Sequence, residues 1–541
     1  MRGVRDSSRR SRLGPNAPGL SDVLAGVSVA LVLIPQSLAY AELAGMPAAT
    51  GLHAAALPLI VAAFFASSPY LQTGPVALTS LLTFGALSPL APPGSSYYTA
   101  LAALLAVGVG LVRVLVGLLN AGVIAYLLAQ PVMAGFTSAA GILIIASQLP
   151  GAFGVSPPLE GVLQGAVWTL INVRLWNPSA IVLAITTGAV ILIGRRIHPL
   201  VPGVLVATAI GIAYSKLAGY SGPTVGAVDA GLPTISLDLP WTRLPALLPA
   251  ATIIALAGFA EPASIARAFA TQDRRIWNPN KEFVSQGMAN LVAGVVQAFP
   301  VGGSFSRSSL NRLAGARTRW SGAVTGIAVL AFLPFAWIVQ PLPIAVLSGI
   351  VITAVAGLVR FRPILEMWSL SIPQFVIGAG TFILTLALAP HIEWAVVLGI
   401  IAAIGVHLWR ELDLFVEIWT EGTTAHVKPH GVLWFGSAAS LERPFQRLLA
   451  ESPQLTRLVL HAGGLGRVDL TGAQLLTRLL EDAEATGLEV RIVEVHPRTG
   501  KVFARMLEKR LSTQASPPGG ARTAAGRADD RPPAGSGTPA P

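Results

Sequence analysis

An arginine and a glutamate lie within otherwise apolar parts of this sequence. Arg307 follows a run rich in glycine and serine, and Glu261 follows the apolar residues 255–260. A charge at membrane depth costs roughly 3 kcal/mol or more, so each residue is a candidate for function. A guanidinium can attract and bind an anion, whereas a carboxylate can carry a coupling proton. Sodium is less favoured because Ala263 and Ile265 offer no oxygen ligands. The structural alternatives are that Arg307 pairs with Glu261 or extends to the aqueous interface.

Two segments with glycine and proline interrupt long apolar stretches. The first covers residues 71–78 and the second residues 299–309. Irregular backbone at membrane depth persists only where protein or a watery cavity satisfies its polar groups. With a boundary near Arg243, each break falls in the third span of one half of the chain, which is typical of an inverted-repeat transporter. The two half-helices would meet head to head, and their free N–H groups and partial positive charges would suit an anion.

Polar residues on the first span and at the breaks complete the predicted site. Gln36 and Tyr40 lie four residues apart on one helix face, and Gln36 can donate to an anion without adding charge. Gln36 could instead satisfy backbone freed by Pro35, and serine and threonine at the breaks could act only as caps. With Glu261 as the proton-coupling residue, the predicted substrate-binding residues are Gln36, Tyr40, Thr73, Gly74, Pro75, Ser304, Phe305, Ser306 and Arg307.

Composition places most of the chain in lipid. Of 541 residues, 53% are hydrophobic and 12% are charged, where about a quarter charged is usual for soluble proteins. Apolar blocks recur between residues 20 and 409, and we expect about fourteen spans across a hydrocarbon core about 30 Å thick. The chain has no cysteine, and we find no phosphate-binding loop, zinc-ligand cluster or serine-hydrolase elbow. We therefore expect no enzyme activity, no metal and no cofactor.

Basic residues gather in every second connection and at the N-terminus, which explains the net charge of +11 without nucleic-acid binding. By the positive-inside tendency these connections face the cytoplasm. An even number of spans then places both termini there, in an inner or plasma membrane. Tryptophans near span ends are predicted interfacial anchors. The basic residues in question are Arg2, Arg5, Arg9, Arg10, Arg12, Arg195, Arg196, Arg267, Arg274, Arg275, Lys281, Arg312, Arg317, Arg319, Arg360 and Arg362; the tryptophans are Trp176, Trp241, Trp320 and Trp394.

A smaller soluble domain follows the membrane region. Predicted strands at 432–435, 458–460 and 488–495, with a helix at 471–485, indicate a small α/β layer. Both chain ends hold too little apolar surface to fold. The predicted parts are a basic cytoplasmic tail (1–19), a transmembrane transport domain (20–412), a cytoplasmic α/β domain (413–511) and a disordered tail (512–541).

Several ordered motifs resemble the sulfate permease family, over roughly residues 20–511. They are residues 22–26, 34–41, 73–75, 261–267, 303–308 and 315–318, and the soluble domain resembles the STAS domain of that family. The resemblance implies a polytopic helical membrane protein with fourteen spans, arranged as two inverted seven-span repeats that form core and gate domains. It also implies elevator-type motion, a homodimer, and a coupling role for the acidic residue Glu261.

We therefore expect a secondary active transporter of sulfate, bicarbonate or a small dicarboxylate, coupled to protons. The main alternative is an uncoupled anion exchanger or channel on the same scaffold. A membrane scaffold that recruits a partner through the STAS-like domain would not need two polar breaks. A nucleobase carrier is suggested only by the analogy of a related fold. The positive charge of Arg307 would contribute little to the binding of a neutral base.

Overall fold

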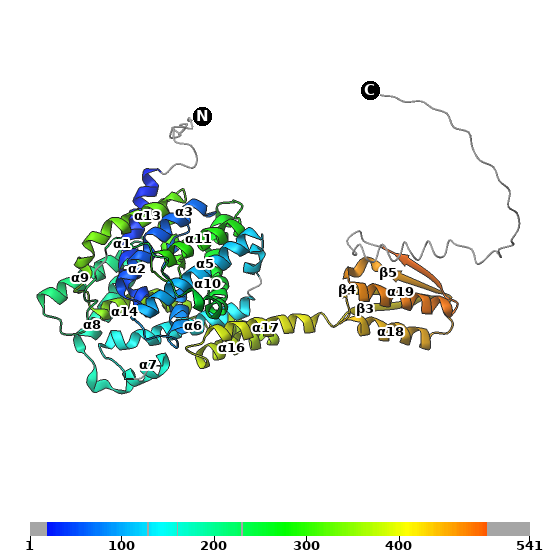
Figure 1. Cartoon of the computed structure of the whole chain (residues 1–541). Helices are drawn as coiled ribbons and strands as arrows, with labels where there is room; N and C mark the ends of the chain where they lie inside the picture. The colour runs from blue at the N-terminus through cyan, green and yellow to red at the C-terminus, as the bar shows by residue number, and fades with distance from the viewer. Residues whose placement is uncertain (1–18, 127–128, 159–160, 229–230, 495–541) are drawn as a thin grey trace, which may run out of the picture. The chain divides into compact units, whose positions relative to one another are not determined.

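The computed structural model describes residues 19–126, 129–158, 161–228 and 231–494. It divides into two compact units, residues 1–404 and 405–541, which are treated separately below (Figure 1). Except for Gly19, the predicted tails 1–19 and 512–541 lie outside the described residues, as do residues 495–511 of the predicted soluble domain.

The first unit is helical, because a helix satisfies its own backbone groups where no water is present. Nine helical stretches of the described residues are long and apolar enough to span a membrane, and four shorter apolar helices accompany them. The predicted total of about fourteen spans stays a prediction. The helices up to the soluble unit are α1 (Leu20–Leu43), α2 (Ala48–Ala55), α3 (Leu57–Phe65), α4 (Ala77–Leu87), α5 (Ser96–Leu118), α6 (Gln130–Phe153), α7 (Val162–Ile171), α8 (Pro178–Ile197), α9 (Gly203–Leu217), α10 (Leu244–Gln272), α11 (Pro279–Val295), α12 (Phe305–Leu313), α13 (Trp320–Phe332), α14 (Ile344–Val355), α15 (Arg362–Leu370), α16 (Ile372–Ala387) and α17 (Glu393–Arg410).

Short 3-10 helices connect or extend several of these elements. They are η1 (Gly122–Tyr126), η2 (Val173–Leu175), η3 (Trp241–Arg243), η4 (Leu333–Val339), η5 (Ala356–Leu358) and, in the soluble unit, η6 (Ala462–Gly464).

The two polar breaks pair with each other. β1 (Thr73–Gly74) and β2 (Gly302–Gly303) form a two-stranded antiparallel sheet, in which Thr73 lies opposite Gly303. Each strand leads almost directly into a helix, α4 after β1 and α12 after β2. Both helices therefore begin at the same small sheet, which confirms that the two breaks meet.

Two proline-containing helices contact the paired breaks. α1 contains Pro35 and contacts α4 and α12, and α10 contains Pro262 and contacts β2, α4 and α12. α11 packs against α3 and α5 and follows α10 in the chain. These helices position the side chains of the site.

The second unit is a small α/β layer, as predicted. The sheet order is β3-β4-β5-β7, with β6 paired to β4; β3 is antiparallel to β4 and the other pairs are parallel. Leucines of two helices pack into its apolar core. Its elements are β3 (Phe415–Glu421), β4 (Thr424–Leu433), α18 (Ala438–Glu451), β5 (Arg457–His461), β6 (Leu465–Val468), α19 (Leu470–Ala485) and β7 (Glu489–Val493).

The expected segments of this unit match the structure in part. The predicted helix at 471–485 is α19, and two predicted strands correspond to β5 and β7. The strand predicted at 432–435 is wrong in its bounds, since β4 is ten residues long and runs from Thr424 to Leu433. β3, β6 and α18 are not among the predicted elements; in α18, Pro444 argues against a helix although Leu441, Phe445 and Leu448 lie at helical spacing.

Candidate binding site at the paired breaks

Arg307 is buried in the first turn of α12 and faces α1 and the first break. Its side chain is 1% exposed. Its Nη1 lies 3.5 Å from Oε1 of Gln36, and a Cβ added to Gly74 would lie 3.6 Å from its Nη2. Within the described residues, its Nε and Nη2 have no hydrogen-bond partner. Because a buried cation with free donors is costly, Arg307 is the residue in this region that most needs an anionic ligand.

The structural alternatives for Arg307 do not match this geometry. The ion pairs found among the described residues do not include one between Arg307 and Glu261, although the two charges lie within electrostatic range. The near-complete burial of the side chain also excludes extension to the aqueous interface.

Gln36 and Tyr40 are both buried on α1, on the face that approaches Arg307. Gln36 uses its amide oxygen toward the guanidinium, so its N–H donors remain for another partner. Its bond is to Arg307 and not to a carbonyl freed by Pro35. The Tyr40 phenol lies within electrostatic range of both Arg307 and Glu261. The structure therefore brings four predicted residues together across α1, α10 and α12.

Glu261 of α10 caps α12. Its Oε1 accepts a hydrogen bond of 3.0 Å from the Phe305 N–H, the first N–H group of that helix. A carboxylate at a helix N-terminus is stabilised by the unpaired donors and the helix dipole. This corrects the expectation that the Phe305 N–H is free for an anion, since the protein's own carboxylate occupies it.

The first break is held in place by side chains from elsewhere. The Thr73 hydroxyl accepts a hydrogen bond of 2.6 Å from Gln286, so it has only its own O–H to donate. Gly74 has φ of +156°, a conformation that side chains rarely adopt. Pro75 has no N–H and directly follows β1, so it helps to end the strand before α4 begins at Ala77.

The two serines of the second break contact each other. The hydroxyls of Ser304 and Ser306 lie 3.3 Å apart, and Ser304 is buried whereas Ser306 is exposed. The Ser304 N–H donates to the carbonyl of Gln72, 3.0 Å away. Ser304 therefore links the two breaks through its backbone, and its hydroxyl is not a helix cap for α12.

A polar face of α11 was missed by the sequence reading. Glu282, Gln286 and Asn290 are fully buried and spaced by four residues, so they share one helix face. Glu282 accepts from the Ser67 and Ser68 N–H groups, at 3.1 and 2.9 Å. This spacing of polar residues in an apolar helix was visible in the sequence.

Asn290 holds the second break directly. Its Oδ1 accepts from the Val301 N–H at 2.9 Å, and its Nδ2 donates to the Val301 carbonyl at 3.0 Å. Together with the Gln286–Thr73 bond, this places both breaks against the same face of α11. The face is therefore a scaffold for the site.

Arg113 of α5 is a second buried arginine that the sequence reading missed. It donates to the carbonyls of Ala255, Ile254 and Val301 at 3.1, 3.2 and 2.9 Å. Gly258 allows this approach, since a Cβ there would lie 2.9 Å from the guanidinium. A lone arginine in the apolar stretch 96–118 was the available signal.

The arrangement can bind an anion without covalent chemistry. It offers one guanidinium with free donors, an amide, hydroxyls and the N-terminus of α4, beside one carboxylate that can gain or lose a proton. No group of three or more potential metal ligands occurs in the part of the chain that the structure describes. A cavity of about 350 Å³ lies elsewhere, near the ends of α3 and α10, and includes none of the predicted site residues.

Family models match both units of the chain. The model described as the sulfate permease family matches residues 20–381, and the STAS domain model matches residues 417–510. A probable sulfate transporter of Mycobacterium tuberculosis is 31% identical over 504 residues, which cover 88% of this chain and 89% of the relative.

Solved structures are also similar to this chain. The murine solute carrier 26 family member A9, an anion transporter in its inward-facing state, matches with a TM-score of 0.81 at 19% identity, covering 90% of this chain and 87% of that one. The transmembrane domain of a cyanobacterial bicarbonate transporter matches with a TM-score of 0.59 at 25% identity, covering 71% of this chain and 97% of that one. The first likeness concerns the fold alone.

Proposed function

This chain belongs to the sulfate permease family, and from this premise we propose that it is a proton-coupled secondary active transporter of a small anion. The family consists of transporters and not enzymes, and the chain is a multi-pass membrane protein with a C-terminal STAS domain. The observation that carries the proposal is the buried guanidinium of Arg307 beside the paired breaks. Its Nε and Nη2 have no hydrogen-bond partner among the described residues.

Sulfate is the first candidate substrate. The Mycobacterium tuberculosis relative is named a probable sulfate transporter, and the cyanobacterial protein a bicarbonate transporter. A guanidinium with amide and hydroxyl donors binds sulfate, bicarbonate or a small dicarboxylate by the same chemistry. Transport assays must therefore compare all three classes.

Proton coupling is proposed at Glu261. Its carboxylate lies at the first N–H group of α12 and within electrostatic range of Arg307. Protonation would remove one negative charge beside the anion-binding group and so favour anion binding. A proton and an anion would then bind together and cross together.

The same proposal includes an elevator-type motion of a core domain against a gate domain, two inverted seven-span repeats and a homodimer, as the family resemblance implies. The meeting of the two breaks, one from each half of the chain, supports the repeats. The positions of the basic connections support cytoplasmic N- and C-termini in an inner or plasma membrane. The alternative function is an uncoupled exchanger or channel on this scaffold.

Uptake by the purified protein in liposomes tests the proposal. Labelled sulfate, bicarbonate and fumarate are each supplied with and without an inward proton gradient. The Glu261→Gln variant keeps an oxygen that can accept from the Phe305 N–H but cannot carry the proton. Glu366→Gln is the matched control, since Glu366 is exposed and forms an ion pair with Arg362 on the same helix, α15.

We expect gradient-driven accumulation of one anion by the native protein and by the control. Glu261→Gln should still exchange that anion but should not accumulate it. If anion flux through the native protein is the same with and without the proton gradient, the protein is an uncoupled exchanger or channel. Accumulation that survives Glu261→Gln would remove Glu261 from the coupling mechanism.

A further inference from the structure

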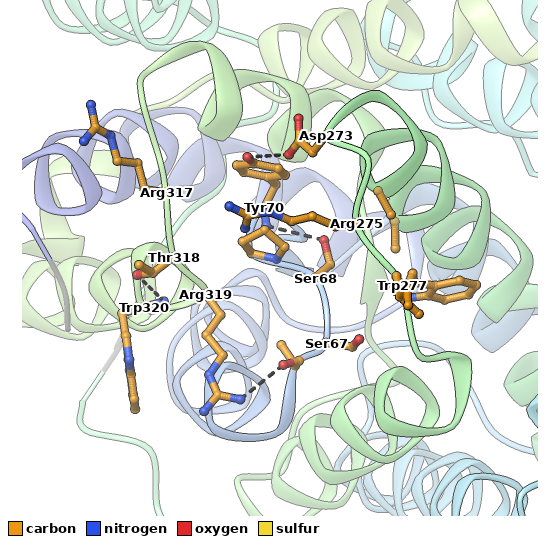
Figure 2. Close-up of a pocket in the computed structure, with 15 residues that line it drawn as sticks. Ser67, Ser68, Tyr70, Asp273, Arg275, Trp277, Arg317, Thr318, Arg319 and Trp320 are labelled. Carbon is orange, nitrogen blue, oxygen red and sulfur yellow. Dashed lines mark hydrogen bonds between the residues drawn. The ribbon is translucent and has the colours of Figure 1, made fainter. Parts of the chain in front are cut away.

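A pocket with basic walls lies near the ends of α3 and α10 (Figure 2). Its volume is about 350 Å³, and it lies between the segment after α3, the C-terminal end of α10 and the connection from α12 to α13. Arg275, Arg317 and Arg319 line it, together with Ser67, Ser68 and Thr318. We call these six residues the basic pocket. The transport proposal does not use it.

Among the described residues that line this pocket, the one carboxylate, Asp273, is already paired. Asp273 accepts a hydrogen bond of 2.7 Å from the Tyr70 hydroxyl and forms an ion pair of 2.7 Å with Arg312. Burial, together with the bond to Asp273, raises the pKa of Tyr70, so the phenol keeps the proton that it donates. Asp273 therefore does not neutralise the arginines of the pocket.

The guanidinium groups of the pocket keep donors for a ligand. Figure 2 shows Arg275 extending across the pocket beside Tyr70. Within the described residues, the side chains of Arg275 and Arg317 make no hydrogen bond or ion pair. Arg319 donates to the Ala66 carbonyl at 3.2 Å and lies over the Trp320 ring. The pocket therefore carries an excess of positive charge.

Hydroxyl donors lie opposite these arginines. The Ser68 hydroxyl accepts from the Tyr70 N–H, and the Ser67 hydroxyl accepts from the Asn278 N–H. Each serine therefore keeps its own O–H to donate. Guanidinium and hydroxyl donors in one concave site are the set that binds phosphate groups.

An apolar flank adjoins the basic pocket. Phe64 is 55% exposed and packs edge to face on Trp320, with ring centroids 5.0 Å apart. Ile276, which also lines the pocket, is fully exposed. Aromatic residues next to basic residues are typical of the membrane interface at headgroup depth, and basic connections are typical of the cytoplasmic leaflet.

We propose that the basic pocket binds the phosphate group of an anionic phospholipid of the cytoplasmic leaflet. The Arg275 guanidinium and the serine hydroxyls contact the phosphate, Arg317 at the edge of the pocket adds positive charge, and the acyl chains lie along Phe64 and Trp320. Inorganic phosphate shares this chemistry, and the apolar flank favours the lipid. Since α10 and α12 also carry Glu261 and Arg307, a bound phosphate would join elements that shape the transport site.

Lipid binding to the purified full-length protein tests this proposal. The protein is titrated with phosphatidylglycerol, phosphatidylcholine or inorganic phosphate, and bound ligand is counted by native mass spectrometry. The test variant is Arg275→Gln with Arg317→Gln; both residues are exposed, so the fold should survive. Arg196→Gln, an exposed arginine at the end of α8, is the matched control.

The native protein and the control should retain phosphatidylglycerol in preference to phosphatidylcholine. The double variant should bind phosphatidylglycerol about tenfold more weakly, as expected for the loss of charge-assisted hydrogen bonds. Retention of inorganic phosphate instead, lost in the double variant, would support the pocket and identify its ligand as a soluble phosphate. Equal binding of phosphatidylglycerol by the native protein and the double variant would overturn the proposal. If the double variant unfolds, the two single variants are compared in the same way.

Discussion

Arg113 and Arg307 are both buried in the membrane unit, but their surroundings differ. Arg113 donates to three backbone carbonyls, two from α10 and one from the segment before β2. Arg307 has a single contact of 3.5 Å with Gln36 and two nitrogens without a partner among the described residues. Both side chains would be costly to bury alone.

The difference is between a buried charge whose hydrogen bonds come from the protein itself and a buried charge that keeps donors for the proposed anion. The protein itself satisfies Arg113, so this residue fixes α5, α10 and the second break in one arrangement. In the proposed function, Arg307 binds an anion that is absent for part of each transport cycle. A site that must release its anion cannot satisfy the cation fully from its own residues, because an internal partner would compete with the substrate.

The largest expected effect is the loss of transport in Arg307→Ala. Removal of one charged hydrogen-bonding group costs about 1.5–3 kcal/mol of anion binding, which is roughly a tenfold to 150-fold loss of affinity. Uptake of the labelled anion in liposomes measures the change, and Arg307→Lys should recover part of it as a point charge. The apparent melting temperature should not fall. Transport close to that of the native protein in Arg307→Ala would contradict the assignment.

Arg113→Met should show the opposite pattern. Methionine keeps much of the volume but donates no hydrogen bond, so the Val301 carbonyl loses one of its donors. The variant also loses the hydrogen bonds to the Ala255 and Ile254 carbonyls, and a hydrogen bond that involves a charged group contributes about 1.5–3 kcal/mol. We expect a lower melting temperature and less folded protein in the membrane, with the apparent KM of the remaining folded protein nearly unchanged. A large rise in KM without loss of stability would place Arg113 at the substrate instead.

The sequence predicted the breaks and the charges better than it predicted their contacts. Gly74–Pro75 and the polar segment around Arg307 could be predicted as breaks, because irregular backbone and charged side chains are rare in lipid. The sequence does not predict that the Glu261 carboxylate caps α12, because this contact depends on how α10 and α12 pack.

Two further features of the membrane unit can be predicted from the sequence but are absent from the predicted site. Arg113 stands alone among apolar residues, and the polar face of α11 repeats every four positions. A charge or a polar face in an unbroken apolar helix is as strong a signal of a buried polar network as a charge beside a break. In the soluble unit, the pattern of β3 is irregular, whereas Leu441, Phe445 and Leu448 of α18 follow helical spacing and indicate an amphipathic helix.

Asn290→Ala tests whether α11 holds the second break. The change leaves the Val301 N–H without its acceptor, at a cost of about 1–3 kcal/mol. We expect a several-fold fall in transport together with a modest fall in melting temperature, between the effects of the two arginine variants. Gln286→Ala is the matched control on the same face, because it releases a side chain of the first break and no backbone group. An effect no larger than that of Gln286→Ala would mean that Asn290 does not fix the second break.

The smallest expected effect is that of Gly74→Ala, which tests the surroundings of Arg307 from the other break. Gly74 has φ of +156°, and a Cβ there would lie 3.6 Å from Nη2 of Arg307, at ordinary contact distance. Alanine strains the backbone by about 1–3 kcal/mol and occupies space beside the free donors. We expect the apparent KM for the anion to rise several-fold while proton coupling persists, since Glu261 is untouched. Gly357→Ala, at a position with open space and no strained φ, is the control. If Gly74→Ala lowers stability but leaves KM unchanged, Gly74 shapes the turn alone and the anion lies farther from the first break.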